Sequence, residues 1–149
     1  MVNLNCTALM QLCHAVLPTM RAKKSGSILN VASAAAFQAG PNMAVYYATK
    51  AFVLSFSEAL HEEMKSDGIK VSCLCPGATK TEFFSAAEAT QIKLTKLASS
   101  PEKVVDDGLA ALGRNQAFVV SGMMNKILVQ STRLSPRIVT RFIAKSLNR

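Results

Sequence analysis

The spacing of apolar residues alternates between two periods along the chain, and this predicts alternating helices and strands. Residues 3–22 and 43–66 carry apolar side chains at steps of three and four, the period of a helix with one buried face. Residues 27–32, 70–75 and 117–120 form short, nearly continuous apolar runs that are typical of buried strands. Strands that alternate with helices favour a parallel sheet joined by right-handed crossovers.

Turn and capping residues place further boundaries. Gly26 is expected to cap the first helix at its C-terminus. The segment Thr79-Lys80-Thr81-Glu82 has the form of a helix capping box, so we expect a helix there, leading into a substrate lid that extends to Ser100. Three more helices are expected: one opened by Ser100-Pro101 and ending at Gly113, one from Met123 to Leu134, and one that starts at Ser135-Pro136.

Composition places the chain among folded globular proteins. Half of the 149 residues are hydrophobic and 17% are charged. No uninterrupted apolar run reaches the ~18 residues that would indicate a membrane span. His14 and His61 have no second ligand at metal spacing, so no metal site is predicted. Buried free thiols in a reducing cytoplasm are expected for the four cysteines, Cys6, Cys13, Cys73 and Cys75.

The net charge of +8 is concentrated at one end of the sequence. Residues 108–149 contain seven Lys or Arg and no acidic residue. A row of cations runs beside a row of apolar side chains there: Arg137, Arg141 and Lys145, then Ile138, Phe142, Ile143 and Leu147. The favoured interpretation is a packed terminal helix with a solvated cationic side, and the alternative is peripheral contact with an anionic membrane surface. Nucleic-acid binding is not expected, because the tail has one aromatic residue and no recognisable binding module.

The candidate chemistry lies around Tyr46 and Lys50, which share a helical face because they are four residues apart. An ammonium within ~4–6 Å favours the phenolate and would lower the pKa of the tyrosine from its usual value near ~10. Ser33 follows the strand at 27–32, where its hydroxyl would hold the oxygen that gains or loses the proton. The alternative acid/base is Tyr47, but it is three residues from Lys50, so Tyr46 is preferred.

An ordered set of motifs resembles the short-chain dehydrogenase/reductase family over roughly the first 110 residues: Asn5, Ser33, Tyr46, Lys50 and Pro76-Gly77-x-x-x-Thr81. The resemblance implies that Tyr46 is the acid/base and that Lys50 tunes it and also binds the nicotinamide ribose. It implies that Ser33 hydrogen bonds the reacting oxygen. Asn5, preferred over Asn3 by its distance to Ser33, would anchor a water that links Lys50 to solvent.

The same resemblance implies the nicotinamide end of a cofactor site. Pro76 and Gly77 would bring backbone close to the nicotinamide, because glycine has no side chain there. Thr81 would bond the carboxamide, and Thr79 would present backbone nearby. Each position also has a plain structural reading: Ser33 as a turn residue, Pro76-Gly77 as punctuation after a strand, and Asn30 as a satisfied buried amide.

No Gly-x-x-x-Gly-x-Gly run, the turn that holds a cofactor diphosphate, occurs in the sequence. We therefore expect the chain to be the C-terminal portion of a longer enzyme. The expected fold class is α/β, a partial Rossmann-type parallel sheet of about three strands flanked by helices. Residues 1–121 would form this part of the domain and residues 122–149 a basic amphipathic helical tail.

The expected function is an NAD- or NADP-dependent oxidoreductase that interconverts an alcohol and a ketone, with the choice of cofactor left open. A small hydrophobic carbonyl or alcohol substrate is indicated by four apolar residues near the expected lid, Phe37, Met43, Phe83 and Phe84. The resemblance also implies a homo-oligomer formed through the first two helices, and a cytoplasmic location follows from the cysteines. The rival interpretation is a non-catalytic member that binds a membrane surface or a partner, and a third is a fragment with no activity of its own.

Overall fold

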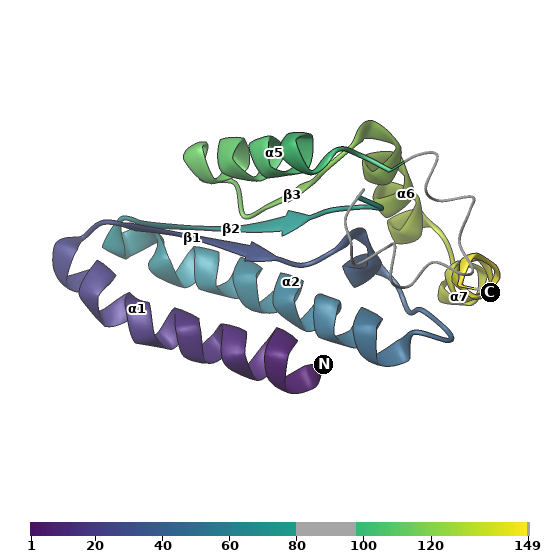
Figure 1. Cartoon of the computed structure of the whole chain (residues 1–149), viewed down its shortest axis with the longest axis horizontal. Helices are drawn as coiled ribbons and strands as arrows, with labels where there is room; N and C mark the ends of the chain where they lie inside the picture. Colours follow the sequence, from purple (N-terminus) through teal and green to yellow (C-terminus); the bar gives the residue numbers. More distant parts are fainter. Residues whose placement is uncertain (80–97, 149) are drawn as a thin grey trace.

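The computed structural model describes residues 1–79 and 98–148. Three parallel strands form one sheet in the order β1-β2-β3: β1 (Gly26–Val31), β2 (Ile69–Cys75) and β3 (Phe118–Val120). All three begin at one end of the molecule and point to the other (Figure 1). The predicted α/β class and partial Rossmann-type sheet are confirmed.

Helices cover both faces of this sheet. The helical elements are η1 (Asn3–Ala8, a π-helical segment), α1 (Leu9–Lys23), η2 (Ala34–Phe37, 3-10), α2 (Ala44–Met64), η3 (Lys65–Asp67, 3-10), α5 (Pro101–Gly113), α6 (Met123–Leu134) and α7 (Arg137–Leu147). α1 and α2 lie on one face and α5 on the other (Figure 1). Ser100 caps α5 by accepting a hydrogen bond from the Lys103 N–H at 3.4 Å, as the Ser100-Pro101 start predicted.

The two crossovers have opposite hands, so the expectation of right-handed crossovers throughout is wrong. Cys73 and Cys75 pack with residues of α2, whereas Leu74 lies against Gly108 of α5, which places the two helices on opposite faces while the strand order runs on in one direction. The right-handed preference arises where a strand feeds directly into its helix. Residues 76–100 separate β2 from α5, and this long connection relaxes that constraint.

The core lies between the sheet and α2. Val53, Val71, Cys73 and Cys75 are at most 1% exposed, and their close packing explains why β2 reads as a continuous apolar run. All four cysteines are free and buried, as expected. Asn30 is a satisfied buried amide: it donates to the Ser57 hydroxyl at 2.9 Å.

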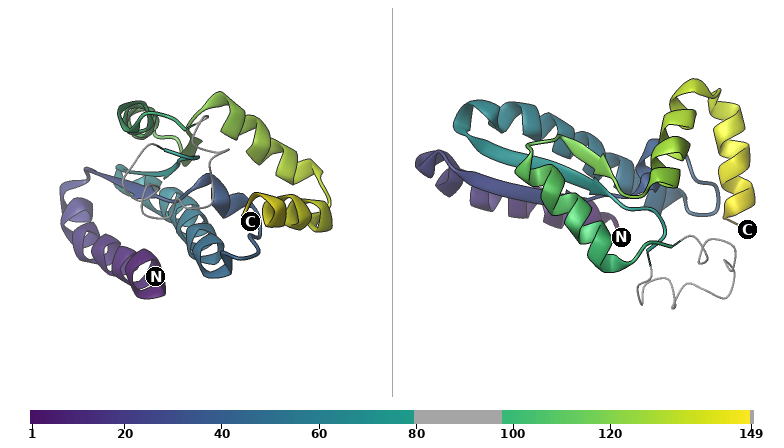
Figure 2. Two further views of the ribbon diagram at one scale, coloured as in Figure 1. Left: turned by 45° about the vertical axis from the view of Figure 1, so that its right-hand side comes forward. Right: turned by 90° about the horizontal axis from the view of Figure 1, so that it is seen from above.

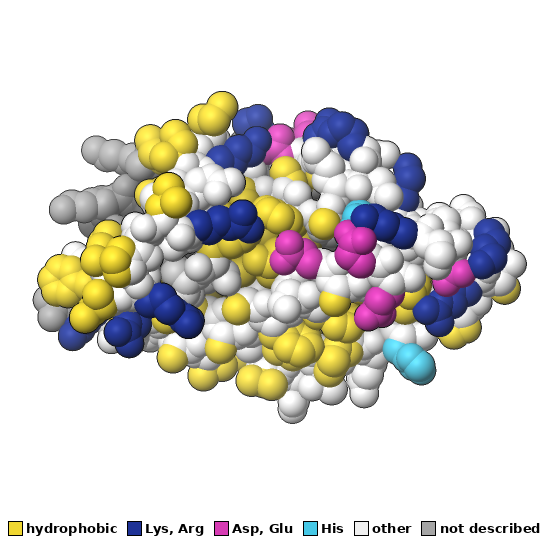
Figure 3. Space-filling model, turned by 180° about the vertical axis from the view of Figure 1, so that it is seen from behind, with side chains coloured by type: hydrophobic (Ala, Val, Ile, Leu, Met, Phe, Trp, Pro, Cys, Tyr) yellow, Lys and Arg dark blue, Asp and Glu magenta, His cyan; other side chains and the backbone are white. Residues whose placement is uncertain are grey.

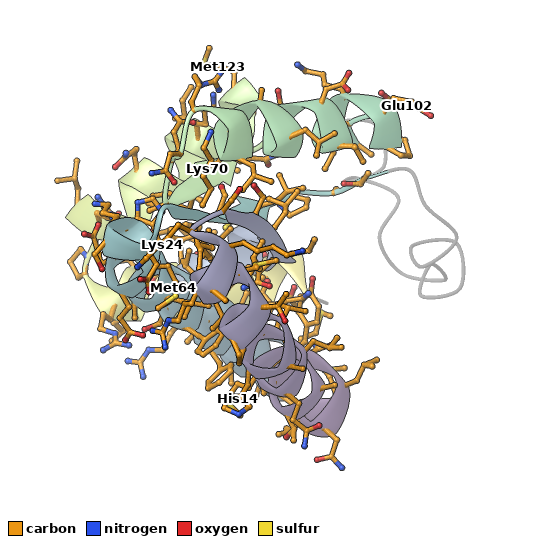
Figure 4. All side chains as sticks on the ribbon, turned by 90° about the vertical axis from the view of Figure 1, so that its left-hand side faces the viewer. His14, Lys24, Met64, Lys70, Glu102 and Met123 are labelled. Atoms are coloured by element: carbon orange, nitrogen blue, oxygen red, sulfur yellow. The ribbon has the colours of Figure 1, made fainter. Side chains whose placement is uncertain are left out.

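The first helix ends differently from the prediction. Lys24, with φ of 49°, is its left-handed C-terminal cap, and Gly26 is instead the first residue of β1. Asp67 holds this turn by accepting from Arg21 at 3.0 Å and Lys24 at 2.6 Å. Gly26 lacks a side chain because that space is filled by Met20. Figure 4 shows Lys24 and Met64 at this end of the molecule, where the strands begin.

α6 and α7 form a helical pair at the opposite end, beside the carboxyl ends of the strands (Figure 2). Asn148 fastens the end of α7 to the segment before α2: its side chain donates to Pro41 O at 3.0 Å and accepts from the Tyr47 hydroxyl at 3.3 Å. The favoured expectation, a terminal helix that buries its apolar side, is wrong for α7, because Ile138 and Phe142 are 67% and 75% exposed. The division into residues 1–121 and 122–149 stays a prediction.

The predicted capping-box helix and lid lie outside the described residues. Within the described parts of the chain, every helix is too short or too polar to cross a bilayer.

Candidate active site

Tyr46 and Lys50 lie on one side of α2, as their spacing predicted. The Lys50 Nζ atom is 5.9 Å from the centroid of the Tyr46 ring. Both residues belong to the first two turns of the helix, which starts at the end of the molecule where the strands finish. This end is where open parallel sheets bind their ligands.

Lys50 also ties α2 to the sheet, because its Nζ donates to the carbonyl oxygen of Val31 at 3.0 Å. Burial lowers the pKa of Lys50, and the negative charge that the nearby cysteine thiols can carry opposes this effect. The ammonium is therefore held at the carboxyl end of β1 rather than extended into solvent.

Ser33 is placed by the pairing of β1 with β2. The ladder continues beyond the strands, with Ala32 N–H donating to Leu74 O at 2.8 Å and Ala34 N–H donating to Pro76 O at 2.7 Å. The Ser33 hydroxyl accepts from Ala35 N–H at 3.1 Å and lies 3.4 Å from Pro76 O. Ser33 is thus a capping residue of η2, its plain structural reading, and it also stands at the ends of two adjacent strands.

Asn5 reaches the site through a threonine that the sequence reasoning did not single out. Its side-chain amide donates to the Thr49 hydroxyl at 3.1 Å, and that hydroxyl donates to Tyr46 O at 2.8 Å. Thr49 is only 3% exposed. Asn5 itself lies in the π-helical segment η1, a type of turn found frequently at functional sites. Thr49 lies between Tyr46 and Lys50 in the sequence, and this position could have indicated that it belongs to the site.

The structure separates the two neighbouring tyrosines by their contacts. The Tyr47 hydroxyl donates to Asn148, and its ring fills the space beside Gly40 that a side chain there would need. The Tyr46 hydroxyl has no hydrogen-bond partner among residues 1–79 and 98–148. Tyr47 therefore has a structural role, and Tyr46 keeps its hydroxyl available.

The segment after β2 packs against α6. A side chain at Gly77 would collide with the side-chain amide of Asn125, which donates to Ser121 O at 2.7 Å. A side chain at Gly77 would therefore have to displace the Asn125 side chain, a contact that the sequence did not reveal. The Thr79 hydroxyl donates to Gly77 O at 3.1 Å. Thr81 lies outside the described residues, so its expected contact with a carboxamide stays a prediction.

The apolar residues expected near the substrate have different surroundings. Phe37 packs against Phe118, with ring centroids 5.8 Å apart, and is half-buried against the core. Met43 is half-buried at the start of α2. Phe83 and Phe84 lie outside the described residues.

A groove of about 400 Å³ runs between the first helix and the outer edge of β1. Its walls are mainly apolar, with Leu12, Val16 and Ile28 among the lining residues, and it also reaches Asn5 and Lys50. The edge strand and two candidate site residues therefore share one depression.

Comparison with sequence families and curated proteins identifies similar dehydrogenases and reductases. The model of the family described as short chain dehydrogenase matches residues 1–92. The very-long-chain 3-oxoacyl-CoA reductase of Rattus norvegicus is 35% identical over 131 residues, covering 85% of this chain and 40% of that protein. Hydroxysteroid dehydrogenase-like protein 1 of Gallus gallus is 35% identical over 113 residues, covering 76% of this chain and 34% of that protein. The chain thus spans about 40% or less of the length of these relatives.

Solved structures agree with this fold. A short-chain dehydrogenase from Sphingobium yanoikuyae in complex with NADPH superposes with a TM-score of 0.72 at 30% identity, covering 89% of this chain and 53% of that one. A 7beta-hydroxysteroid dehydrogenase superposes with a TM-score of 0.85 at 25% identity, covering 97% of this chain and 57% of that one.

Proposed function

Because the chain belongs to the short chain dehydrogenase family, we propose that it carries the proton-transfer residues of a nicotinamide-dependent oxidoreductase that interconverts an alcohol and a ketone. The observation that supports this most directly is the placement of Tyr46 and Lys50 on one side of α2. Ser33 and Pro76 contact each other just beyond the carboxyl ends of β1 and β2, at the end of the molecule where α2 begins.

In this proposal each side chain has one task. In the direction of reduction, the carbonyl carbon accepts a hydride and the Tyr46 hydroxyl gives its proton to the carbonyl oxygen. The product is the alcohol. The Lys50 ammonium stabilises the negative charge that the Tyr46 oxygen then carries. The Ser33 hydroxyl donates to the reacting oxygen. Asn5 and Thr49 hold the first turn of α2 in place through Tyr46 O.

The donor set fits the nicotinamide end of a dinucleotide. An ammonium and a phenol suit ribose hydroxyls, and the backbone and hydroxyl groups from Pro76 to Thr79 suit a carboxamide. A bound nicotinamide nucleotide would supply or accept the hydride. NADPH is the first cofactor to test, because a solved relative at 30% identity holds it.

We propose a ketone on an apolar molecule as the substrate. The names of the matched relatives support this class: an oxoacyl-CoA reductase, a hydroxysteroid dehydrogenase-like protein and a 7beta-hydroxysteroid dehydrogenase.

Tyr46→Phe tests the acid/base assignment. It removes the hydroxyl that moves the proton, so turnover should fall by about 10²- to 10⁴-fold while cofactor affinity changes little. The measurement is NADPH consumption with an apolar ketone, together with cofactor titration, on the longest natural form of the protein.

Tyr47→Phe is the matched control, since it removes the neighbouring hydroxyl and only its bond to Asn148. Turnover should stay within a few-fold of wild type. Near-normal turnover in Tyr46→Phe would remove the acid/base role from Tyr46. Absence of turnover in the wild-type protein would instead favour a non-catalytic member of the family.

A further inference from the structure

The outward side of α7 is its apolar side. Thr140 and Ala144, which face the rest of the molecule, are 9% and 0% exposed. Ile138 and Phe142 are 67% and 75% exposed. A surface helix normally turns its apolar stripe to the core and its polar residues to water. α7 is therefore inverted relative to a helix that packs on its own domain.

α6 continues the same surface. Its inward residue Val129 is 6% exposed, whereas Met123, Ile127 and Leu134 are 74%, 58% and 90% exposed. We call the combined surface the outer face, with the members Met123, Ile127, Leu134, Ile138, Phe142 and Ile143. Figure 3 shows hydrophobic side chains gathered at the end of the molecule that carries α6 and α7, with Lys and Arg side chains beside them. Met123 projects away from the ribbon in Figure 4.

Cations flank this apolar surface. Arg137, Arg141 and Lys145 follow one side of α7 at steps of four, and all three are exposed. No ion pair involving α6 or α7 occurs among the described residues, and residues 108–149 contain no acid that could form one within the segment. Exposed apolar side chains bordered by unpaired cations are typical of helices that lie in a lipid interface.

Charge decides between the possible occupants of the outer face. A second copy docked by two-fold symmetry would bring the two cationic rows near each other, with no acid on either helix to offset the repulsion. A nucleic acid would suit the cations but would leave the exposed Ile138 and Phe142 without partners. An anionic lipid surface suits both parts, because headgroups meet the cations and the acyl boundary takes the apolar side chains.

We propose that the outer face of α6 and α7 binds an anionic lipid surface. Asn148 links the end of α7 to Pro41 and Tyr47, so this docking would hold the Tyr46 end of α2 near the bilayer. The binding is independent of cofactor and catalysis.

The test is co-sedimentation of the 149-residue chain with vesicles. Vesicles of equal parts phosphatidylcholine and phosphatidylserine should sediment the chain, and vesicles of phosphatidylcholine alone should sediment much less. The variant Ile138→Glu/Phe142→Glu should reduce binding to the anionic vesicles by about tenfold or more, since it places two anions at the interface.

The matched control makes the same change elsewhere. Val105 and Leu109 of α5 are 51% and 54% exposed, so Val105→Glu/Leu109→Glu makes the same change in charge at two exposed apolar positions on another helix. This variant should bind the anionic vesicles nearly as well as wild type. A second variant, Arg137→Gln/Arg141→Gln, keeps the apolar side chains and should also weaken binding, which decides the question if the first variant fails to fold by circular dichroism.

Three results would overturn the proposal. Equal sedimentation of wild type with both kinds of vesicle would show that charge is not recognised. Unchanged binding of Ile138→Glu/Phe142→Glu would show that the outer face is not the contact. A concentration-dependent dimer in sedimentation equilibrium that this variant abolishes, without lipid binding, would identify a second copy as the occupant.

Discussion

Lys50 is the residue at which the candidate chemistry and the stability of the fold meet. Its Nζ atom donates to Val31 O and also lies 5.9 Å from the Tyr46 ring centroid. Burial lowers the pKa of Lys50, so its charged form is less favoured in the folded chain than in the unfolded one. The proposed chemistry needs the Lys50 cation, but its burial in the folded chain disfavours the charged form and so lowers the free energy of unfolding.

The pH dependence of stability should reveal this conflict. Between the lowered pKa of Lys50 and its ordinary value near ~10.4, the unfolded chain binds more protons than the folded chain. The free energy of unfolding should therefore rise with pH across that window in wild type, and Lys50→Met should lack this contribution. The measurement is denaturant unfolding of both proteins at several pH values from neutral to alkaline.

Lys70→Met controls for the loss of a lysine-to-carbonyl hydrogen bond, because the Lys70 ammonium donates to Gly113 O at 2.9 Å. If the stability difference between wild type and Lys50→Met is the same at every pH, burial does not disfavour the Lys50 cation.

At the scale of elements, β1 is one edge strand of the three-stranded sheet that the structure describes. It pairs with β2 on one side only within the described residues, and Val31 at its end is 49% exposed. The groove beside it is lined largely by apolar side chains. An unpaired apolar edge is a template for pairing with another chain.

Val31→Glu should therefore make the 149-residue chain less prone to aggregate, since a charge on an edge strand opposes edge-to-edge pairing. Light scattering at increasing protein concentration measures this, and its onset should move to clearly higher concentration. Val45→Glu makes the same change at a site on α2 that is 54% exposed, and it should have a much smaller effect. An equal effect of the two substitutions would attribute the gain to net charge alone.

The sequence predicted most elements because their apolar periods are strong, as in the strand ending at Cys75 and the helix from Met123 to Leu134. It missed the cap at Lys24 because a left-handed C-terminal cap is usually glycine, and here a lysine adopts that conformation. Periodicity also cannot say which side of an amphipathic helix meets the body of the protein, so the sequence favoured a packed α7 and left an exposed apolar side as the alternative. The hand of the second crossover likewise depends on the long connection before α5.

In the candidate site, too, local features were predictable and contacts between distant residues were not. The spacing of Tyr46 and Lys50 predicted a shared face because helix geometry is local. Thr49 and Asn125 were missed because their contacts with Asn5 and with the Gly77 position join residues far apart in sequence.

At the scale of the whole molecule, the groups that suit a cofactor serve only one end of it. They lie at the carboxyl ends of β1 and β2, and the sequence has no Gly-x-x-x-Gly-x-Gly turn for a diphosphate. The expected cytoplasmic location stays a prediction. So does the homo-oligomer through the first two predicted helices, residues 3–22 and 43–66, on which Leu12 and Val45 are exposed apolar residues.

The 149-residue chain should consequently bind NADPH and NADH only weakly, with Kd above about 1 mM and no measurable turnover. The reason is that the diphosphate carries much of the charge of the cofactor and has no cradle among these residues. Fluorescence titration of each nucleotide with the purified chain measures this. Saturable binding at micromolar concentration would contradict it.

Asn148 connects the end of α7 to the start of α2. Its side chain is fastened to Pro41 and to Tyr47, the immediate neighbour of Tyr46. An affinity tag or fluorescent fusion joined after residue 149 is therefore attached one residue from this clasp. Such a label could disturb the hydrogen bonds of Asn148 to Pro41 and Tyr47 and so the first turn of α2, and labels for this protein should be attached elsewhere on its surface.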